Sequence, residues 1–123
     1  MQTDAIHLPA IPATDLESPP LERADTIPSR WYWDPAFDRL DRDAVFARTW
    51  QGVGHAGQVQ GEGQFFCAEV AGNPVIVIRG KDGVLRGFYN VCRHRGGPLA
   101  VEPEGCVRAL RCKYHGWTYL LDG

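Results

Sequence analysis

The chain has 123 residues, with 13 lysines and arginines against 15 aspartates and glutamates, and 44% of its residues are hydrophobic. This length is enough for one small domain and too short for a barrel-sized catalytic domain. The hydrophobic content excludes a chain that is disordered throughout. A formal charge of −2 gives no reason to expect nucleic-acid binding.

No stretch approaches the roughly 18 consecutive apolar residues that a membrane-spanning helix needs. The first residues are acidic rather than basic and lead into Pro9, so no signal peptide is recognisable. We therefore expect a cytoplasmic protein that does not contact a membrane. In a reducing compartment, cysteines favour metal binding over disulfides. The chain has four cysteines: Cys67, Cys92, Cys106 and Cys112.

Residues 1–29 are expected to form a flexible, proline-rich arm, because they hold too few bulky apolar side chains to offset the entropy of ordering. Residues 30–50 are expected to form a helical lead-in to the β region. Asp34 is the expected N-cap of a helix with Pro35 at its first position, and Asp41 is the expected cap of a second helical segment.

All 14 glycines lie after residue 51, where they separate short β-prone runs. Asp82 and Gly83, placed between two such runs, predict a tight hairpin turn. We see no internal repeat. The expected strands are residues 64–70, 74–79, 84–91, 106–112 and 117–120.

Two short segments each combine one cysteine with one histidine and follow a predicted strand. One residue separates Cys92 from His94, two separate Cys112 from His115, and 17 residues lie between the two pairs. Each histidine is soon followed by glycine, which permits a turn whose backbone N–H groups point at a bound anion.

Two thiolates and two imidazoles could hold a single Zn²⁺, but structural zinc sites usually take paired cysteines from one element and paired histidines from another. A Rieske [2Fe–2S] cluster has cysteines on one iron and histidines on the other. It suits two equivalent loops that each supply one cysteine and one histidine. The sequence favours the cluster, and a zinc-stapled interaction module remains the alternative.

These motifs resemble the Rieske-type non-haem iron oxygenase large subunits. The match lies in Cys-x-His-Arg-Gly (residues 92–96) and Cys-x-x-His-Gly-Trp-x-Tyr (residues 112–119), and it extends over about residues 30–123. The family includes aromatic-ring-hydroxylating dioxygenases and the choline and carnitine monooxygenases. The resemblance implies a mostly β, antiparallel Rieske-type domain over residues 51–123, with cluster loops at about 91–98 and 112–117. Its implied cluster ligands are Cys92, His94, Cys112 and His115.

The resemblance further implies that electrons pass from a reductase or ferredoxin to a mononuclear iron in a C-terminal domain. That iron site is absent from these residues. Because the family's Rieske domain continues past the position of Gly123, we expect an incomplete domain that does not turn over substrate by itself. A homo-oligomer of trimer type is implied for the full-length family. The motifs do not separate aromatic from quaternary ammonium substrates, and a stand-alone Rieske ferredoxin stays open as an alternative.

Two departures separate the chain from the respiratory-complex Rieske proteins, which carry one extra cysteine in each loop. The matching residues here are Gly97 and Tyr114, and Trp117 stands where those proteins place a serine hydroxyl. Fewer hydrogen bonds to the cluster predict a potential of roughly −150 to 0 mV, at the low end of the Rieske range. The family places a hydroxyl like that of Tyr119 near a cluster cysteine.

Several other residues have simpler expected roles. Cys67 and Cys106 alternate with apolar residues and are expected to be buried, and His55 is expected to be a structural histidine. Arg95 is expected to bond a carbonyl or an acid. Near the two motifs, basic residues form either a solvated face or a surface that steers an acidic ferredoxin or flavin reductase. They are Arg86, Arg93, Arg95, Arg108, Arg111 and Lys113.

Overall fold

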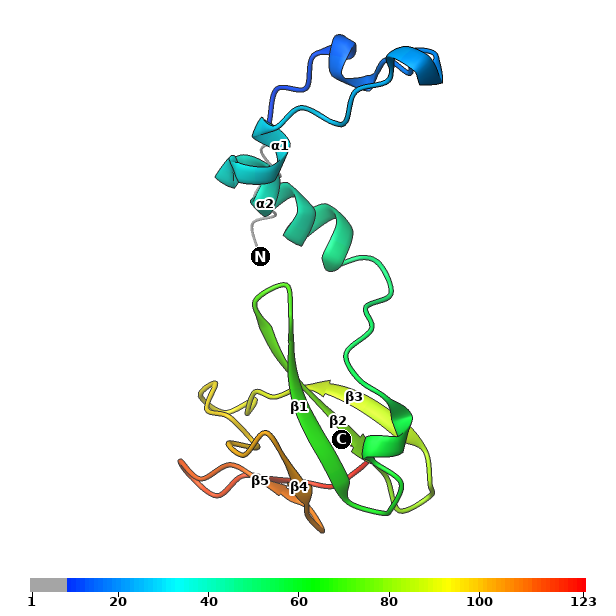
Figure 1. The fold of residues 1–123 in the computed structure, drawn as a ribbon. Helices are drawn as coiled ribbons and strands as arrows, with labels where there is room; N and C mark the ends of the chain where they lie inside the picture. Colours follow the sequence, from blue (N-terminus) through cyan, green and yellow to red (C-terminus); the bar gives the residue numbers. More distant parts are fainter. Residues whose placement is uncertain (1–8) are drawn as a thin grey trace. The chain divides into compact units, whose positions relative to one another are not determined.

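The computed structural model describes residues 9–123. The chain divides after Trp50 into two compact units, and each is described by itself (Figure 1). The first unit carries the helices α1 and α2, and the second, Gln51–Gly123, carries the strands. Among the described residues, no helix has the length and apolar character that crossing a membrane requires.

The helical lead-in begins where the sequence predicts it. Asp34 is the N-cap of α2 (Pro35–Leu40), since its Oδ1 accepts the N–H of Ala36 at 2.9 Å. The predicted cap at Asp41 is wrong, because this residue has helical dihedral angles of φ −61° and ψ −43°. It begins a π-helical turn, η3 (Asp41–Phe46), that directly follows α2.

The predicted flexible arm lies partly outside the described residues. Its described part contains two single-turn 3₁₀ helices, η1 (Ala13–Leu16) and η2 (Leu21–Arg23). Asp15 forms an ion pair with Arg30, the first residue of α1 (Arg30–Trp33), and accepts a hydrogen bond from the indole of Trp31. These contacts connect η1 to the helical part of the same unit.

The second unit is built on an antiparallel sheet whose four strands lie in the order β3-β2-β1-β4. A second, two-stranded ladder pairs β5 with β6. The structure therefore confirms the mostly β, antiparallel fold class (Figure 1). The strands are β1 (Gln64–Val70), β2 (Asn73–Arg79), β3 (Leu85–Tyr89), β4 (Glu104–Cys106), β5 (Leu110–Arg111) and β6 (Thr118–Tyr119).

The strand predicted over residues 106–112 is wrong, because the chain is split there into β4 and β5. The backbone N–H of Val107 donates to the carbonyl of Gly63 at 2.9 Å, just beyond the end of β1 pairing. Gly63 has a φ of +75°, and a Cβ there would lie 2.0 Å from the Val107 oxygen, so only glycine fits. The strands predicted over 84–91 and 117–120 are shorter in the structure.

The main hydrophobic cluster lies on one face of the four-stranded sheet. Phe65 on β1 pairs with Ile78 on β2, and both side chains are buried, as the period of two along a strand requires. Leu110 and Leu121 pack onto this face and are also buried. Because Leu110 opens β5, this packing places the start of the second ladder over the sheet and fixes where the chain must turn at residue 112.

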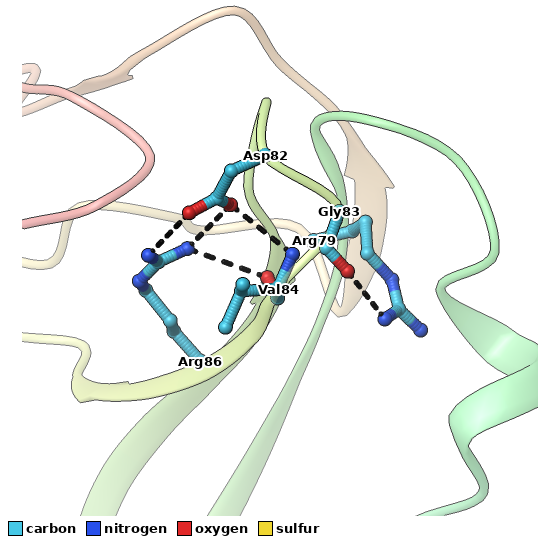
Figure 2. Close-up of polar contacts among 5 residues, drawn as sticks. All are labelled: Arg79, Asp82, Gly83, Val84 and Arg86. Carbon is cyan, nitrogen blue, oxygen red and sulfur yellow. Dashed lines mark hydrogen bonds and ion pairs between the residues drawn. The ribbon is translucent and has the colours of Figure 1, made fainter.

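The turn between β2 and β3 is the tight hairpin that the sequence predicts (Figure 2). The Asp82 carboxylate accepts the N–H of Val84 at 3.1 Å and pairs with the guanidinium of Arg86 at 2.7 Å. Arg79 donates to the carbonyl of Gly83 at 2.9 Å from the other strand. The hydrogen bonds from Arg86 hold the pKa of the Asp82 carboxyl well below its usual range.

Candidate metal centre

The two cysteine-histidine segments form loops with the same backbone hydrogen bonds. In the first loop, the N–H of Cys92 donates to the carbonyl of Gly97, and the N–H of Gly96 donates to the carbonyl of Cys92. In the second, the N–H of Cys112 donates to the carbonyl of Trp117, and Gly116 donates back to Cys112. Each loop thus has six residues and is closed at the same two positions.

A glycine in the left-handed conformation stands fifth in both loops. Gly96 has a φ of +71° and Gly116 a φ of +75°, a region that other L-residues rarely adopt. The glycines that follow the histidines in the sequence therefore have a physical reason: they reverse the chain so that its N–H groups turn inward. The pKa of the Cys92 thiol is lowered chiefly by the Tyr119 hydroxyl and further by the backbone N–H groups of His94 and Arg95 in this turn.

The loops meet, and they bring the two predicted ligand histidines next to each other. Cys92 and Cys112 are both buried, and the Cys112 side chain contributes to the lowered pKa of the Cys92 thiol. The imidazoles of His94 and His115 lie with their ring centroids 4.8 Å apart and edge to face. The two loops thus carry two buried thiols and two exposed imidazoles.

Tyr119 lies against the first cysteine, where the family resemblance places its hydroxyl. The Oη atom is 3.4 Å from the Cys92 sulfur and accepts the backbone N–H of Arg93 at 2.9 Å. Because the hydroxyl oxygen already accepts a bond, its proton is available to the sulfur. This bond lowers the pKa of the Cys92 thiol and raises the pKa of Tyr119.

Asn90 is a supporting residue that the sequence analysis missed. Its side chain is 8% exposed, its Oδ1 accepts the N–H groups of Leu99 and Ala100, and its Nδ2 donates to the Ala100 carbonyl at 2.7 Å. It therefore ties the segment entering the first loop to the segment leaving it. A polar residue inside the apolar run before Cys92 was the available signal.

Aromatic rings flank both imidazoles. The indole of Trp117 stacks on the ring of His94 from the opposite loop, with centroids 4.9 Å apart and planes within 4°. The ring of Tyr114 lies 3.9 Å from that of His115. Trp117 was expected at the start of a strand over residues 117–120, but it lies outside β6 and contributes to the loops instead.

The donor set fits a two-iron cluster better than a single ion. A structural zinc site needs four ligands that converge on one point. Within residues 9–123, no three histidine, cysteine, aspartate or glutamate side chains are grouped in this way. A Rieske cluster takes only two protein ligands on each iron, so it needs no such group. Buried thiols, inward N–H groups and two adjacent imidazoles match that requirement.

The structure corrects two of the simpler expectations and bears out a third. Cys106 is exposed rather than buried, because β4 is an edge strand, whereas Cys67 is partly buried and packs against the core. The guanidinium of Arg95 makes no hydrogen bond or ion pair with any of residues 9–123. His55 is structural as expected: its Nδ1 caps η4 (Ala56–Gln58) by accepting the N–H of Gly57.

The family follows from a direct comparison. The chain belongs to the Rieske [2Fe-2S] domain family, whose pattern matches residues 49–123. The match covers both cysteine-histidine loops and the four-stranded sheet, and it confirms the Rieske-type cofactor class that the motifs predict.

Similar proteins are oxygenase subunits. The glycine betaine monooxygenase oxygenase subunit of Chromohalobacter salexigens is 35% identical over the whole chain, which spans 28% of that protein. The choline monooxygenase of Arabidopsis thaliana is 41% identical over 85% of the chain and 24% of its own length. The chain thus spans about a quarter of the curated relatives it matches.

Solved structures of Rieske oxygenases also superpose on this chain. An apo quaternary ammonium Rieske monooxygenase superposes with a TM-score of 0.76 and 37% identity, covering 80% of this chain and 29% of that one. Naphthalene 1,2-dioxygenase from Rhodococcus sp. superposes with a TM-score of 0.76 and 31% identity, covering 79% of this chain and 22% of its own.

Proposed function

We propose that this chain carries one electron at a time through a [2Fe–2S] cluster held by Cys92 and Cys112 on one iron and by His94 and His115 on the other. The observation that carries the proposal is the pair of loops with identical backbone closure, which bring one buried thiol and one imidazole each to the same place. When bound, the cluster supplies one-electron redox chemistry.

The chain's own residues prepare that site in three ways. Burial of Cys92 and Cys112 excludes water from the sulfur side, whereas the exposed histidines leave the other side open to solvent or to a partner. The Tyr119 hydroxyl stabilises negative charge on the Cys92 sulfur. The amide of Asn90 holds the first loop in position through three hydrogen bonds.

The parent activity that we propose is hydroxylation next to a quaternary ammonium group by a mononuclear iron domain outside these residues. The relatives named above act, by their names, on glycine betaine and choline, and a third relative is a carnitine monooxygenase oxygenase subunit of Escherichia coli, 36% identical over 83% of this chain. Hydroxylation of an aromatic ring is the second candidate, favoured by the likeness to naphthalene 1,2-dioxygenase.

The electron donor is, in this proposal, a reductase or a ferredoxin, and the acceptor is the catalytic iron of the same assembly. A trimer-type homo-oligomer and a cytoplasmic location, both inferred from the sequence, remain predictions. The alternative of a stand-alone ferredoxin has less support, because all three of these relatives are oxygenase subunits or whole monooxygenases. The zinc alternative has less support because no three ligand side chains of residues 9–123 converge.

Anaerobic reconstitution of the full chain with iron and sulfide tests the proposal. We expect visible absorption and about two irons and two acid-labile sulfides per chain, since that is the cluster composition. Cys92→Ser and His94→Ala should each abolish this loading. Cys106→Ser and His55→Ala are the matched controls and should load normally, because both residues lie outside the loops. Colourless protein that retains only zinc would overturn the assignment.

A further inference from the structure

The two predicted ligand histidines are held by different ring contacts. The indole of Trp117 stacks flat on the imidazole of His94, and these two residues belong to opposite loops. The ring of Tyr114 lies against His115, its neighbour in the same loop, with the planes tilted by 39°. The contact with Trp117 therefore relates a histidine of one loop to the backbone of the other, whereas Tyr114 moves with the loop that carries His115.

His94 needs such a contact because no hydrogen bond orients its ring. Its side chain is exposed, and none of residues 9–123 forms a hydrogen bond with the imidazole. A metal-bound histidine usually donates its second ring N–H to a carboxylate, a carbonyl or water, and this bond fixes the orientation of the ring. Without a partner, the χ2 torsion of histidine is broad and roughly two-fold. An unsupported His94 would thus present its nitrogen over a wide range of directions.

Trp117 is well placed to supply the missing support. Its carbonyl accepts the N–H of Cys112 at 2.9 Å and closes the second loop, and the next residue, Thr118, pairs with Arg111 in the β5–β6 ladder. The backbone that carries the indole is therefore held on both sides. The indole is 49% exposed, and its planes and centroids relative to His94, within 4° and 4.9 Å apart, suit a favourable offset stack.

We propose that Trp117 is a positioning residue that orients His94 for binding the cluster. This inference rests on the proposed function. The indole limits rotation of the imidazole and covers one of its faces, so His94 is already turned before an iron binds. The respiratory Rieske proteins place a serine hydroxyl at this position, which acts on the cluster through a hydrogen bond. In this chain the same position acts on the cluster through one of its ligands.

Pulsed electron paramagnetic resonance of the reduced, cluster-loaded chain, labelled with nitrogen-15 histidine, tests this role. Each bound histidine nitrogen has its own hyperfine coupling, which depends on the orientation of the imidazole plane. Trp117→Leu should shift or broaden one of the two couplings and leave the other unchanged, because the indole stacks on His94 and not on His115. Release of iron to a chelator should become about threefold to tenfold faster, as expected from the loss of one aromatic pair.

Two further variants serve as rescue and control. Trp117→Phe keeps a ring that can stack, so it should retain both couplings and release iron within about twofold of the wild-type rate. Trp50→Leu is the matched control, because Trp50 is fully exposed and lies outside the second unit. It should change neither the couplings nor the rate of release.

Three results would overturn the positioning role. They are unchanged couplings in Trp117→Leu, an equal change of both couplings, which would indicate a general loss of loop structure, and a Trp117→Phe variant that behaves like Trp117→Leu. If Trp117→Leu binds no cluster, the phenylalanine variant decides: normal loading with both couplings retained supports the role, and failure to load refutes it. A wild-type chain without visible absorption after reconstitution would instead contradict the proposed function itself.

Discussion

A disulfide between the two loops is the sharpest test of their placement. Gly97 and Tyr114 stand at the positions where the respiratory Rieske proteins carry their extra cysteines. A Cβ built at Gly97 would lie 3.8 Å from the Cβ of Tyr114 and 3.4 Å from the Cys112 sulfur. The Cβ atoms of a disulfide are separated by about 3.5–4.5 Å, so the double variant Gly97→Cys/Tyr114→Cys should oxidise without backbone movement. Gly97 does not have a positive φ, so a side chain is tolerated there.

The expected gain in stability follows from the length of the closed loop. Positions 97 and 114 are 17 residues apart in the chain. Cross-linking a loop of this length removes about 3 kcal/mol of unfolded-state entropy at 25 °C. Urea unfolding of the cluster-loaded double variant, oxidised against reduced with a phosphine, measures the difference. The two single variants show what each substitution costs alone.

Two results would contradict this placement of the loops. The first is free thiols that persist in the folded double variant under oxidising conditions, detected by alkylation and mass spectrometry. The second is an oxidised form no more stable than the reduced one. Either would mean that the two Cβ positions are not adjacent in solution. The first loop would then not face the second as the structure has it.

Three further predictions concern the supports of the site. Tyr119→Phe removes the hydrogen bond to Cys92 and should lower the reduction potential by roughly 50 mV, close to tenfold in the redox equilibrium; an unchanged potential in a dye-mediated titration would refute this role. Asn90→Ala leaves buried N–H groups unpaired and should lower the free energy of unfolding in urea by about 2–3 kcal/mol. A loss under about 0.5 kcal/mol would contradict the supporting role of Asn90. Asp82→Asn should reduce the loss of stability at acid pH. The pKa of Asp82 in the folded protein lies below its unfolded value of about 3.9. The ion pair with Arg86 therefore stabilises the fold above that pH and loses this effect as the pH falls further. Thermal unfolding between about pH 3 and 6 should therefore show a smaller acid-induced loss in the variant than in the wild type.

Local sequence signals predicted the parts of the fold that depend on neighbouring residues. β1 has the predicted bounds, Gln64–Val70, because its apolar run buries the neighbouring Phe65 and Phe66 on opposite faces of the strand. The Asp82-Gly83 turn was predictable because both the Asx hydrogen bond and the positive φ arise within four residues. The cap at Asp34 is local in the same sense.

Three of the features that the sequence analysis missed depend on distant partners. The split between β4 and β5 is set by the contact of Val107 with Gly63, which lies 44 residues earlier in the chain. The exposure of Cys106 depends on β4 being an edge strand, which is a property of the strand order. The side chain of Asn90 accepts hydrogen bonds from Leu99 and Ala100, which lie nine and ten residues later in the chain. No window of a few residues holds this information.

The unequal spacing of the two motifs has a simple structural explanation. Cys-x-His and Cys-x-x-His differ by one residue, which suggests loops of different length, yet both loops have six residues and the same closing hydrogen bonds. The histidine stands third in the first loop and fourth in the second, so Tyr114 occupies the place of His94 and Arg95 occupies the place of His115. The loops are therefore equivalent in backbone and offset in side chains. Because the sulfurs sit at the same first position in both, the thiol side of the site follows the shared backbone. The histidine side does not follow the shared backbone, because the two histidines occupy different loop positions, and their imidazoles meet edge to face.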